Sequence, residues 1–216
     1  MNFLENMGIK INNKALLSTA LTHTSYSNEH GVESYERLEF LGDAILEAVT
    51  SEYFYLHTNL REGDMTKTRA NFVCEKALAC YARDLGIDKY IRLGHGQIHN
   101  LNDTIIADVF EAVAAVIYLD QGFDAAKQYL DTIIIPYIKD KRDFNSDYKS
   151  ILQEAVQTTK KSLEYVLLNE YGESHDKTFE MAVKIDNIIY GKGLGKSKKE
   201  AEQNAALDAL NKSAVK

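Results

Sequence analysis

The chain has 216 residues, enough for one or two domains with cores of their own. Its hydrophobic fraction of 45% and charged fraction of 26% are ordinary for a globular protein and exclude a disordered chain. No apolar run approaches the roughly 18 residues needed to cross a bilayer, and residues 1–10 lack a signal-peptide core. We therefore expect a cytoplasmic protein with no membrane partner.

The net charge of -7 argues against nucleic-acid binding when it is taken alone. Residues 1–143 hold 14 Lys and Arg against 21 Asp and Glu, whereas residues 144–216 hold 11 of each. An acidic site and a basic patch can therefore occupy different domains. Cys74 and Cys80 lie six residues apart in a helical pattern, which does not bring their side chains together, so we expect buried thiols.

The first two thirds of the chain show helical periodicity separated by polar loops. Helices are predicted at residues 13–21, 36–57, 64–85, 103–120 and 123–137, with loops at 23–33 and 90–102. Asn12 or Asn13 is expected to cap the first helix and Ser34 the second, and Gly86 follows the third, as is common just past a helix C-terminus. This pattern predicts an all-α domain over residues 1–139.

Residues 36–46 (ERLEFLGDAIL) predict an amphipathic helix in which Leu38, Leu41 and Ile45 share one apolar stripe. A neighbouring face carries a row of carboxylates at steps of three, four and four residues: Glu36, Glu39, Asp43 and Glu47. A solvated acidic face is the commoner meaning of such a row. The sharper interpretation is one half of a Mg2+ site, which needs a second acidic helix to supply further oxygen ligands.

Residues 105–120 (IIADVFEAVAAVIYLD) supply such a helix, because a helix that is apolar all round is a buried one. Asp108 and Glu111 share one of its faces, and ionised carboxylates are rarely buried without a partner. Pairing of each acid with an arginine in the core is the alternative. Two adjacent acids in an apolar helix favour a shared cation instead.

The two helices together present two close carboxylate pairs: Glu39 with Asp43, and Asp108 with Glu111. Carboxylates are the ligands that Mg2+ prefers, and Mn2+ can substitute for it. Bound divalent ions can activate water and stabilise a leaving oxygen, which suits hydrolysis of a phosphodiester. Glu36 and Glu62 are secondary candidates for this site, and Glu47 is expected to be solvated.

Residues 140–147 are polar, lack a pattern and predict a linker. Beyond them, helices are predicted at residues 148–159 and 197–210, with strands at 163–168, 179–185 and 188–194. Asp186 and Asn187 predict a turn, and Ser197 a helix cap. The order α-β-β-β-α predicts a small α+β domain over residues 148–216, with both helices on one face of the sheet.

Residues 191–199 (GKGLGKSKK) predict a flexible glycine loop in front of a helix N-terminus, with Lys196, Lys198 and Lys199 around it. Backbone N–H groups and the helix dipole favour phosphate there, and lysine adds charge without reading bases. The alternative is a solvated basic helix start. A P-loop is excluded, because the spacing GxxxxGK[ST] does not occur.

These motifs resemble a known family. Residues 36–46 look like the signature of ribonuclease III, and residues 105–120 look like the second acidic helix of that family. The tail is similar to a double-stranded-RNA-binding domain, and the matching positions are Gln153-Glu154, Gly172, His175, Phe179 and residues 193–206. The resemblance spans nearly the whole chain.

The resemblance implies a homodimeric, Mg2+-dependent endonuclease that cuts double-stranded RNA and leaves 5'-phosphate and 3'-hydroxyl ends. Precursors of ribosomal and other structured RNAs are the expected substrates, and no organic cofactor is implied. The family's metal-binding acids match Glu39, Asp43, Asp108 and Glu111, of which Asp43 and Glu111 are expected to be indispensable. Phe40 matches a residue that packs across the family's dimer interface.

In the tail, the resemblance assigns minor-groove contacts to Gln153, Glu154 and His175, and phosphate contacts to the lysines at 196–199. Two of the chain's departures from the family bear on RNA binding. Many relatives carry a basic residue before the second acidic helix, where this chain has residues 99–102 (HNLN), and many carry Lys where it has Glu202. We expect weaker and less salt-dependent RNA binding as a result.

Two other classes of function compete with the nuclease. One is a non-catalytic double-stranded-RNA-binding protein on the same scaffold. The other is an acidic helical interaction domain that binds no metal. The complete set of four acids argues against the first, because a retired site need not keep charges that destabilise the fold. The second predicts no thermal shift with Mg2+ or Mn2+, so a metal titration distinguishes it.

Overall fold

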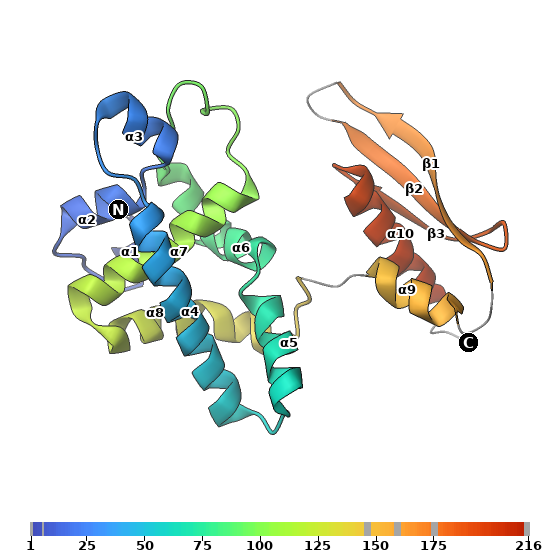
Figure 1. Cartoon of the computed structure of the whole chain (residues 1–216), viewed down its shortest axis with the longest axis horizontal. Coiled ribbons are helices and arrows are strands. Elements are labelled where there is room, and N and C mark those ends of the chain that lie inside the picture. Colours follow the sequence, from blue (N-terminus) through green and yellow to red (C-terminus); the bar gives the residue numbers. More distant parts are fainter. Residues whose placement is uncertain (1, 6, 145–147, 158–160, 174–176, 214–216) are drawn as a thin grey trace. The chain divides into compact units, whose positions relative to one another are not determined.

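The structure is a computed structural model that describes residues 2–5, 7–144, 148–157, 161–173 and 177–213. Contacts divide the chain into two compact units, residues 1–145 and 146–216 (Figure 1). The first unit is all-helical and the second combines helices with a sheet, so the predicted fold class is confirmed. Within the described ranges, no helix has the length and apolar character required to span a membrane.

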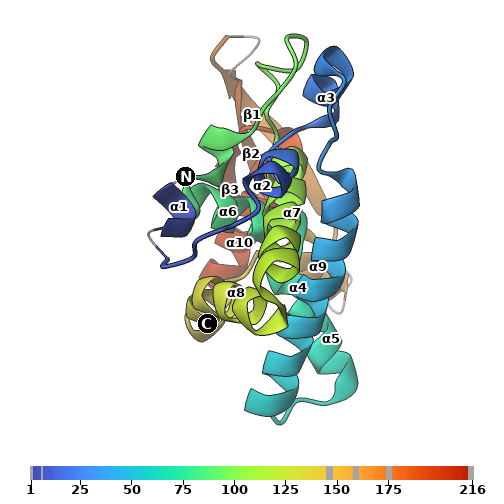
Figure 2. The same ribbon diagram turned by 90° about the vertical axis from the view of Figure 1, so that its left-hand side faces the viewer.

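The first unit is built around one buried helix, α7 (Asp103–Gln121). Its other elements are α1 (Asn2–Glu5), α2 (Lys14–Ala20), α3 (Thr24–His30), α4 (Glu36–His57), α5 (Glu62–Phe72), α6 (Glu75–Leu85), the 3-10 helix η1 (Ile87–Tyr90) and α8 (Phe123–Lys139). Helices α2, α4, α6 and α8 pack against α7 (Figures 1 and 2). Every residue from 105 to 117 is buried except Asp108 and Glu111, so the predicted burial of this helix is confirmed.

The single helix predicted for residues 64–85 is wrong, because the chain forms α5 and α6 with a break at Val73 and Cys74. Cys74 has extended backbone angles and precedes α6. The break lets the two helices meet different partners: α5 contacts α4, whereas α6 turns its apolar face onto α7. One straight helix could not present both faces in these directions.

The loop predicted for residues 23–33 is also wrong, because Thr24–His30 forms α3. The ring Nδ1 of His23 accepts a hydrogen bond from the Ser25 backbone N–H at 3.1 Å and caps the helix. Gly31 ends it in the left-handed conformation, with φ of 64°. Helix α3 buries no residue, so it shows no apolar periodicity. Ser34 does not cap α4; its hydroxyl donates to Glu36 at 2.9 Å instead.

The segment after α8 stays attached to the helical unit as far as Phe144. The Phe144 backbone N–H donates to Oδ1 of Asn71 at 2.7 Å, and Nδ2 of Asn71 donates to the Arg142 carbonyl at 2.8 Å. The Phe144 ring lies 5.6 Å from the ring of Tyr81 and 5.7 Å from that of Tyr137. Arg142 and Phe144, which were predicted as part of a linker, therefore contact the helical unit.

The second unit has the order α9 (Tyr148–Gln157), β1 (Leu163–Tyr171), β2 (Thr178–Ile185), β3 (Ile188–Gly195) and α10 (Lys198–Ser213). The strands form an antiparallel sheet in the order β1-β2-β3, and α9 and α10 cover one face of it around a shared core. Asp186 and Asn187 take positive φ values of 48° and 65°, which form the two-residue turn of a hairpin. The predicted α-β-β-β-α order is confirmed.

The strand predicted at residues 188–194 is confirmed as β3, but the flexible glycine loop predicted within residues 191–199 is wrong, because Gly191, Gly193 and Gly195 belong to that strand. They face α10. A Cβ on Gly193 would lie 2.3 Å from the backbone nitrogen of Ala205, and one on Gly191 would lie 2.2 Å from the Ala205 carbonyl oxygen. The glycines therefore let a helix approach a strand closely, and the connection to α10 shortens to two residues, 196 and 197.

Candidate functional site

The two predicted acid pairs meet where α4 crosses α7, and a glycine makes this contact. Gly42 is buried in α4, and a Cβ on it would lie only 1.9 Å from the carbonyl oxygen of Glu111. Any other residue would force the helices apart. Gly42 lies directly before Asp43 in the acidic row. The signal in the sequence was a glycine inside a predicted helix, where glycine costs about 1 kcal/mol relative to alanine.

This contact turns the four acids into one electrostatic cluster. Burial, and after it the negative charges of Asp43, Glu39 and Asp108, raise the pKa of Glu111 to about 8. The pKa of Glu39 is raised by burial and then by Asp108, Glu36 and Asp43. A raised carboxyl pKa means that the ionised form lacks compensation from the protein. The structure thus brings Glu39, Asp43, Asp108 and Glu111 together.

Asp108 has a partner that the sequence did not indicate. The Tyr35 hydroxyl donates a hydrogen bond to its Oδ2 at 2.9 Å. Burial raises the pKa of Asp108, the Tyr35 bond and the nearby His23 lower it, and Glu75 raises it again. The only local signal was a tyrosine directly before the acidic helix, 73 residues away from Asp108 in the chain. Among the described residues, neither Asp108 nor Glu111 forms an ion pair with an arginine, which was the alternative to a shared cation.

The donor set suits a hydrated hard cation better than a closed cage. No group of three or more His, Cys, Asp or Glu side chains among the described residues is arranged to hold a metal ion. Mg2+, however, keeps several of its waters and is commonly held by one or two carboxylates. The neighbouring carboxylates raise the pKa of Glu39 and of Glu111, and a positive charge would relieve this repulsion. The cluster therefore fits a divalent ion chemically.

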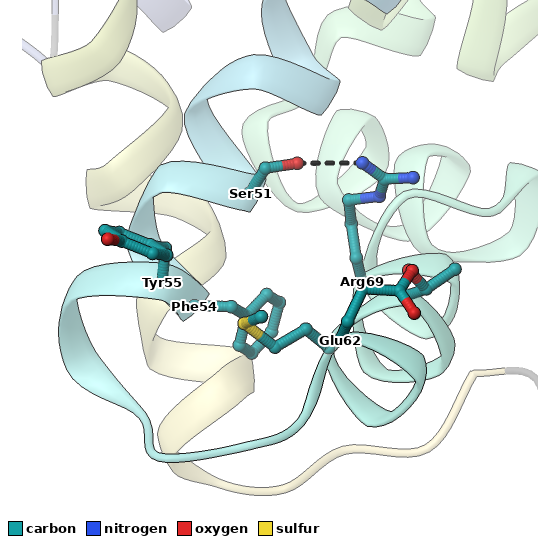
Figure 3. A pocket seen from close by; sticks show the side chains of 7 residues that line it. Ser51, Phe54, Tyr55, Glu62 and Arg69 are labelled. Atoms are coloured by element: carbon teal, nitrogen blue, oxygen red, sulfur yellow. Dashed lines mark hydrogen bonds between the residues drawn. The ribbon is translucent and has the colours of Figure 1, made fainter.

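The two secondary candidates, Glu36 and Glu62, lie near different turns of α4. Glu36 is exposed and adjoins the cluster, since its charge raises the pKa of Glu39. Glu62 begins α5 and lines a pocket with Ser51 and Tyr55 (Figure 3). Ser51 is twelve residues beyond Glu39, which corresponds to roughly 18 Å along α4. Glu62 therefore lies beside a later turn of α4 than the turns that carry Glu39 and Asp43.

Glu47 was expected to be solvated, but the structure gives its carboxylate a partner. Its carboxylate lies 3.9 Å from the guanidinium of Arg69, and its charge contributes to the raised pKa of Glu111. Figure 3 shows Arg69 reaching from α5 to Ser51 on α4, to which it donates at 2.8 Å. Arg69 thus ties the two helices together at the edge of the acidic row.

Phe40 points to solvent. Its side chain is 82% exposed, which is the highest value among the large hydrophobic side chains that the structure describes. A cavity of about 550 Å³ adjoins the same stretch of α4, and its apolar lining consists of Leu16, Leu38, Leu41 and Leu119. The residue pattern alone could only place Phe40 beside the acidic row. The structure shows a side chain that a monomer leaves uncovered.

In the second unit, the predicted phosphate-binding residues lie at the start of α10. Ser197 caps this helix, since its hydroxyl accepts from the Glu200 backbone N–H at 3.2 Å. Lys198 and Lys199 are exposed in the first turn, and the Lys198 ammonium lies 5.8 Å from the centre of the Phe179 ring. The backbone N–H of Lys196 donates to the Glu200 carboxylate at 2.7 Å.

The predicted minor-groove residues Gln153 and Glu154 are exposed on α9, whereas His175 lies outside the described residues. Both departures from the family pattern have a structural role. Asn102 caps α7 by accepting from the Ile105 backbone N–H at 3.0 Å. Glu202 forms an ion pair with Lys149 and so joins α10 to α9.

Comparison with known proteins agrees with this geometry. A family model described as Ribonuclease-III-like matches residues 13–138, and one described as a double-stranded RNA binding motif matches residues 148–213. A protein named Ribonuclease 3 from Mesoplasma florum is 45% identical over 220 residues, covering 97% of this chain and 95% of the relative. A Ribonuclease 3 from Streptococcus pyogenes is 43% identical over 212 residues, covering 94% and 92%.

Two solved structures of the nuclease domain of ribonuclease III from Campylobacter jejuni resemble the first unit. Both are 34% identical to this chain and cover 61% of it, with TM-scores of 0.57 and 0.56. The match includes 93% and 90% of those chains. The two family models follow the division of the chain into two units, with the double-stranded RNA binding motif on the second. The chain therefore belongs to the ribonuclease III family.

Proposed function

We propose that the chain is an endoribonuclease that hydrolyses phosphodiester bonds of double-stranded RNA with divalent metal ions, and leaves 5'-phosphate and 3'-hydroxyl ends. The observation that carries this proposal is the uncompensated acid cluster at the crossing of α4 and α7. The ribonuclease III family depends on divalent metals, and the second unit supplies a motif that binds double-stranded RNA. Ribosomal and other structured RNA precursors in the cytoplasm are the proposed substrates.

Glu39, Asp43, Asp108 and Glu111 are the residues that would hold Mg2+. When bound, the ion supplies a water of lowered pKa and positive charge for the leaving oxygen. Glu111 contributes a half-buried carboxyl at the base of the cluster, and Asp43 contributes an exposed one beside it. Glu36 can add negative charge at the rim. Mn2+ has the same preference for carboxylate and water ligands and can replace Mg2+.

The second unit would hold the duplex by its shape and backbone. Lys196, Lys198 and Lys199 surround the N-terminus of α10, where lysine charge and backbone N–H groups favour phosphate. Gln153 and Glu154 are exposed on α9, so neither side chain contributes to the core of this unit. Together with His175 they are the proposed contacts to the minor groove, where 2'-hydroxyls distinguish RNA from DNA.

The active form is proposed to be a homodimer. Exposed Phe40 and the leucine-lined cavity lie on the same stretch of surface, so the two-fold partner can fill one with the other. One of the Campylobacter jejuni structures is described as showing flexibility in the region involved in dimer formation of that nuclease domain. Phe40→Ala should shift the chain toward monomer in sedimentation, whereas Ile98→Ala, which removes another exposed side chain, should not.

Cleavage of a long RNA duplex tests the proposed activity directly. The full chain with Mg2+ should cut the duplex, and its products should be degraded by an exonuclease that requires a 5'-phosphate. Glu111→Ala should slow cleavage by about 10²- to 10³-fold or more, the usual cost of removing an electrostatic stabiliser of the transition state. Asp103→Ala is the matched control, since Asp103 lies on the same helix but pairs with Arg83.

Each competing function predicts another result. A non-catalytic RNA-binding protein would bind the duplex and leave it intact with every metal. An acidic interaction domain would show no change in thermal unfolding with Mg2+ or Mn2+. Equal cleavage rates for wild type and Glu111→Ala would also contradict the proposed catalytic role of the acid cluster.

A further inference from the structure

Tyr35 is the one residue outside the acid cluster whose side chain bonds directly to a cluster carboxylate in the described part of the chain. It directly precedes α4 and is only 4% exposed. Its hydroxyl donates to Oδ2 of Asp108 across the interface between α4 and α7, at 2.9 Å. The bond therefore links the start of the first acidic helix to the first acid of the second.

The backbone of Tyr35 is also fixed by a hydrogen bond. Its N–H donates to the carbonyl of Thr22 at 2.9 Å, and Thr22 is fully buried. Thr22 in turn forms an isolated bridge with Arg92, whose guanidinium donates to the Ser18 carbonyl at 2.6 Å. These contacts fix the backbone from which the phenol extends, so the hydroxyl has a set position before any ligand arrives.

The tyrosine ring is also confined. The His23 ring lies 5.8 Å from it, tilted by 49°, and Nδ1 of His23 is fixed by the Ser25 hydroxyl at 2.8 Å. A buried ring in this position cannot leave Asp108 without disturbing the junction between α2 and α3. The phenol is thus a rigid donor for Asp108 and not a mobile surface group.

Asp108 needs such a donor because its neighbours repel it. An aspartate that shares a half-buried space with Glu39 and Glu111 can lower its energy by turning its carboxylate away from them. A hydrogen bond to Oδ2 opposes this rotation and leaves the other oxygen to face a cation. Partners of this kind orient the carboxylates and histidines that bind metals, and their loss typically costs about 10- to 100-fold in metal affinity or activity.

We propose that Tyr35 is a positioning residue, which orients the Asp108 carboxylate for a divalent ion through its hydroxyl. This role rests on the proposed metal-dependent function. The alternative is that Tyr35 only fills the junction before α4. The phenol ring would serve that purpose without its oxygen, so removing the oxygen alone separates the two roles.

The test compares Tyr35→Phe with Tyr137→Phe in the full chain. Tyr137 is a matched control, because its hydroxyl also donates to an aspartate, Asp84, in a contact between α8 and α6. Calorimetric titration with Mn2+ in the absence of RNA is the main measurement. Tyr35→Phe should raise the Kd for Mn2+ by about 10- to 100-fold, and Tyr137→Phe should leave it unchanged. Circular dichroism without metal confirms that both variants are folded.

Asp108→Asn and the double variant complete a thermodynamic cycle. If Tyr35 acts through Asp108, removing its hydroxyl should add nothing to the effect of Asp108→Asn on Mg2+-dependent cleavage. An additive loss would overturn the proposal, as would a Mn2+ isotherm for Tyr35→Phe that superimposes on that of wild type. A wild-type chain that neither takes up Mn2+ nor cuts duplex RNA would reject the proposed function itself, and the role of Tyr35 with it.

Discussion

The two units use glycine for the same packing purpose and obtain opposite electrostatic results. In the helical unit, Gly42 lets α4 approach the backbone of α7 at Glu111. In the RNA-binding unit, Gly191 and Gly193 let β3 approach the backbone of α10. The first contact gathers like charges in a half-buried space. The second gathers alanines in a core and leaves the charged residues at the surface.

Charged residues of the second unit form ion pairs, whereas the described residues give Glu39, Asp43, Asp108 and Glu111 no ion pair. Ion pairs join Lys149 with Glu202 and Lys212 with Asp208. In the helical unit, burial and mutual repulsion raise the pKa of Glu111 to about 8. A site whose charges destabilise the protein on their own is a strong indication of a ligand that compensates them. The lysines of α10 give no such indication, and their role follows from exposure and from the family.

The largest effect is expected for Gly42→Ala, which disrupts the close contact between α4 and α7 in the helical unit. A Cβ that meets a backbone carbonyl at 1.9 Å cannot be accommodated by a rotamer change, and α7 is packed on all sides. We expect a loss of about 3 kcal/mol in the free energy of unfolding, together with weakened metal binding. Urea denaturation measures the first. Gly63→Ala in α5 is the control, since its Cβ meets nothing within 4 Å.

Gly193→Ala disrupts the corresponding contact in the RNA-binding unit, between β3 and α10. Its Cβ would lie 2.3 Å from the Ala205 backbone nitrogen, and α10 packs on β2, β3 and α9, whereas α7 packs on α2, α4, α6 and α8. We expect a destabilisation of about 2 kcal/mol that is confined to this unit. Hydrogen exchange should show faster opening of β3 and α10 and unchanged protection of α7. Loss of protection in α7 as well would contradict two separately packed units.

The acid cluster also predicts how stability depends on pH without metal. Between the ordinary glutamate pKa of 4.5 and the raised pKa of about 8, folded Glu111 keeps a proton that the unfolded chain has lost. Stability from this group is therefore present at low pH and is lost as pH rises through 8. Glu111→Gln should be more stable than wild type at pH 9, by on the order of 2 kcal/mol, and nearly equal to it at pH 5.

Denaturation in a chelating buffer at both pH values measures this difference. A Glu111→Gln variant that is less stable than wild type at pH 9 would show that the carboxylate is already compensated by the protein. The direction of the pKa shift would then be wrong, and the contrast between the two units would disappear.

The smallest effect is expected for Lys198→Ala, which removes one exposed charge from the start of α10. A single phosphate contact should lower duplex affinity modestly and reduce the slope of log K against log salt by about 1. Filter binding at several salt concentrations measures the slope. Lys212→Ala is the control, because Lys212 pairs with Asp208 in the last turn of the same helix. Equal slopes for both variants would contradict the proposed contact between Lys198 and a phosphate.

Much of the fold follows from local pattern. Helices α4 and α7 were predicted nearly to the residue, because long apolar stripes mark their extent. The break between α5 and α6 could not be predicted, since the helical pattern runs through it and only the different partners of the two helices require it. Helix α3 was missed because it buries no side chain and depends on a local histidine cap.

The candidate site shows the same limit. Spacing within each helix was enough to predict the two acid pairs, because neighbours on a helix face are three or four residues apart. Gly42 and Tyr35 depend instead on contacts between distant segments, and Tyr35 reaches an acid 73 residues away. The pairing of Glu202 with Lys149 likewise spans 53 residues. Residues that support a site from another element leave no periodic signal in the sequence.

Calorimetric titration of the full chain with Mg2+ at pH 7, in two buffers of different ionisation enthalpy, tests the central claim most directly. If the four acids form a metal centre, wild type should bind Mg2+ and release about one proton, because Glu111 is largely protonated beforehand. Glu111→Gln should bind more weakly and release none. Absence of a binding heat for wild type, or binding that Glu111→Gln leaves unchanged, would contradict the assignment of this cluster as the metal centre.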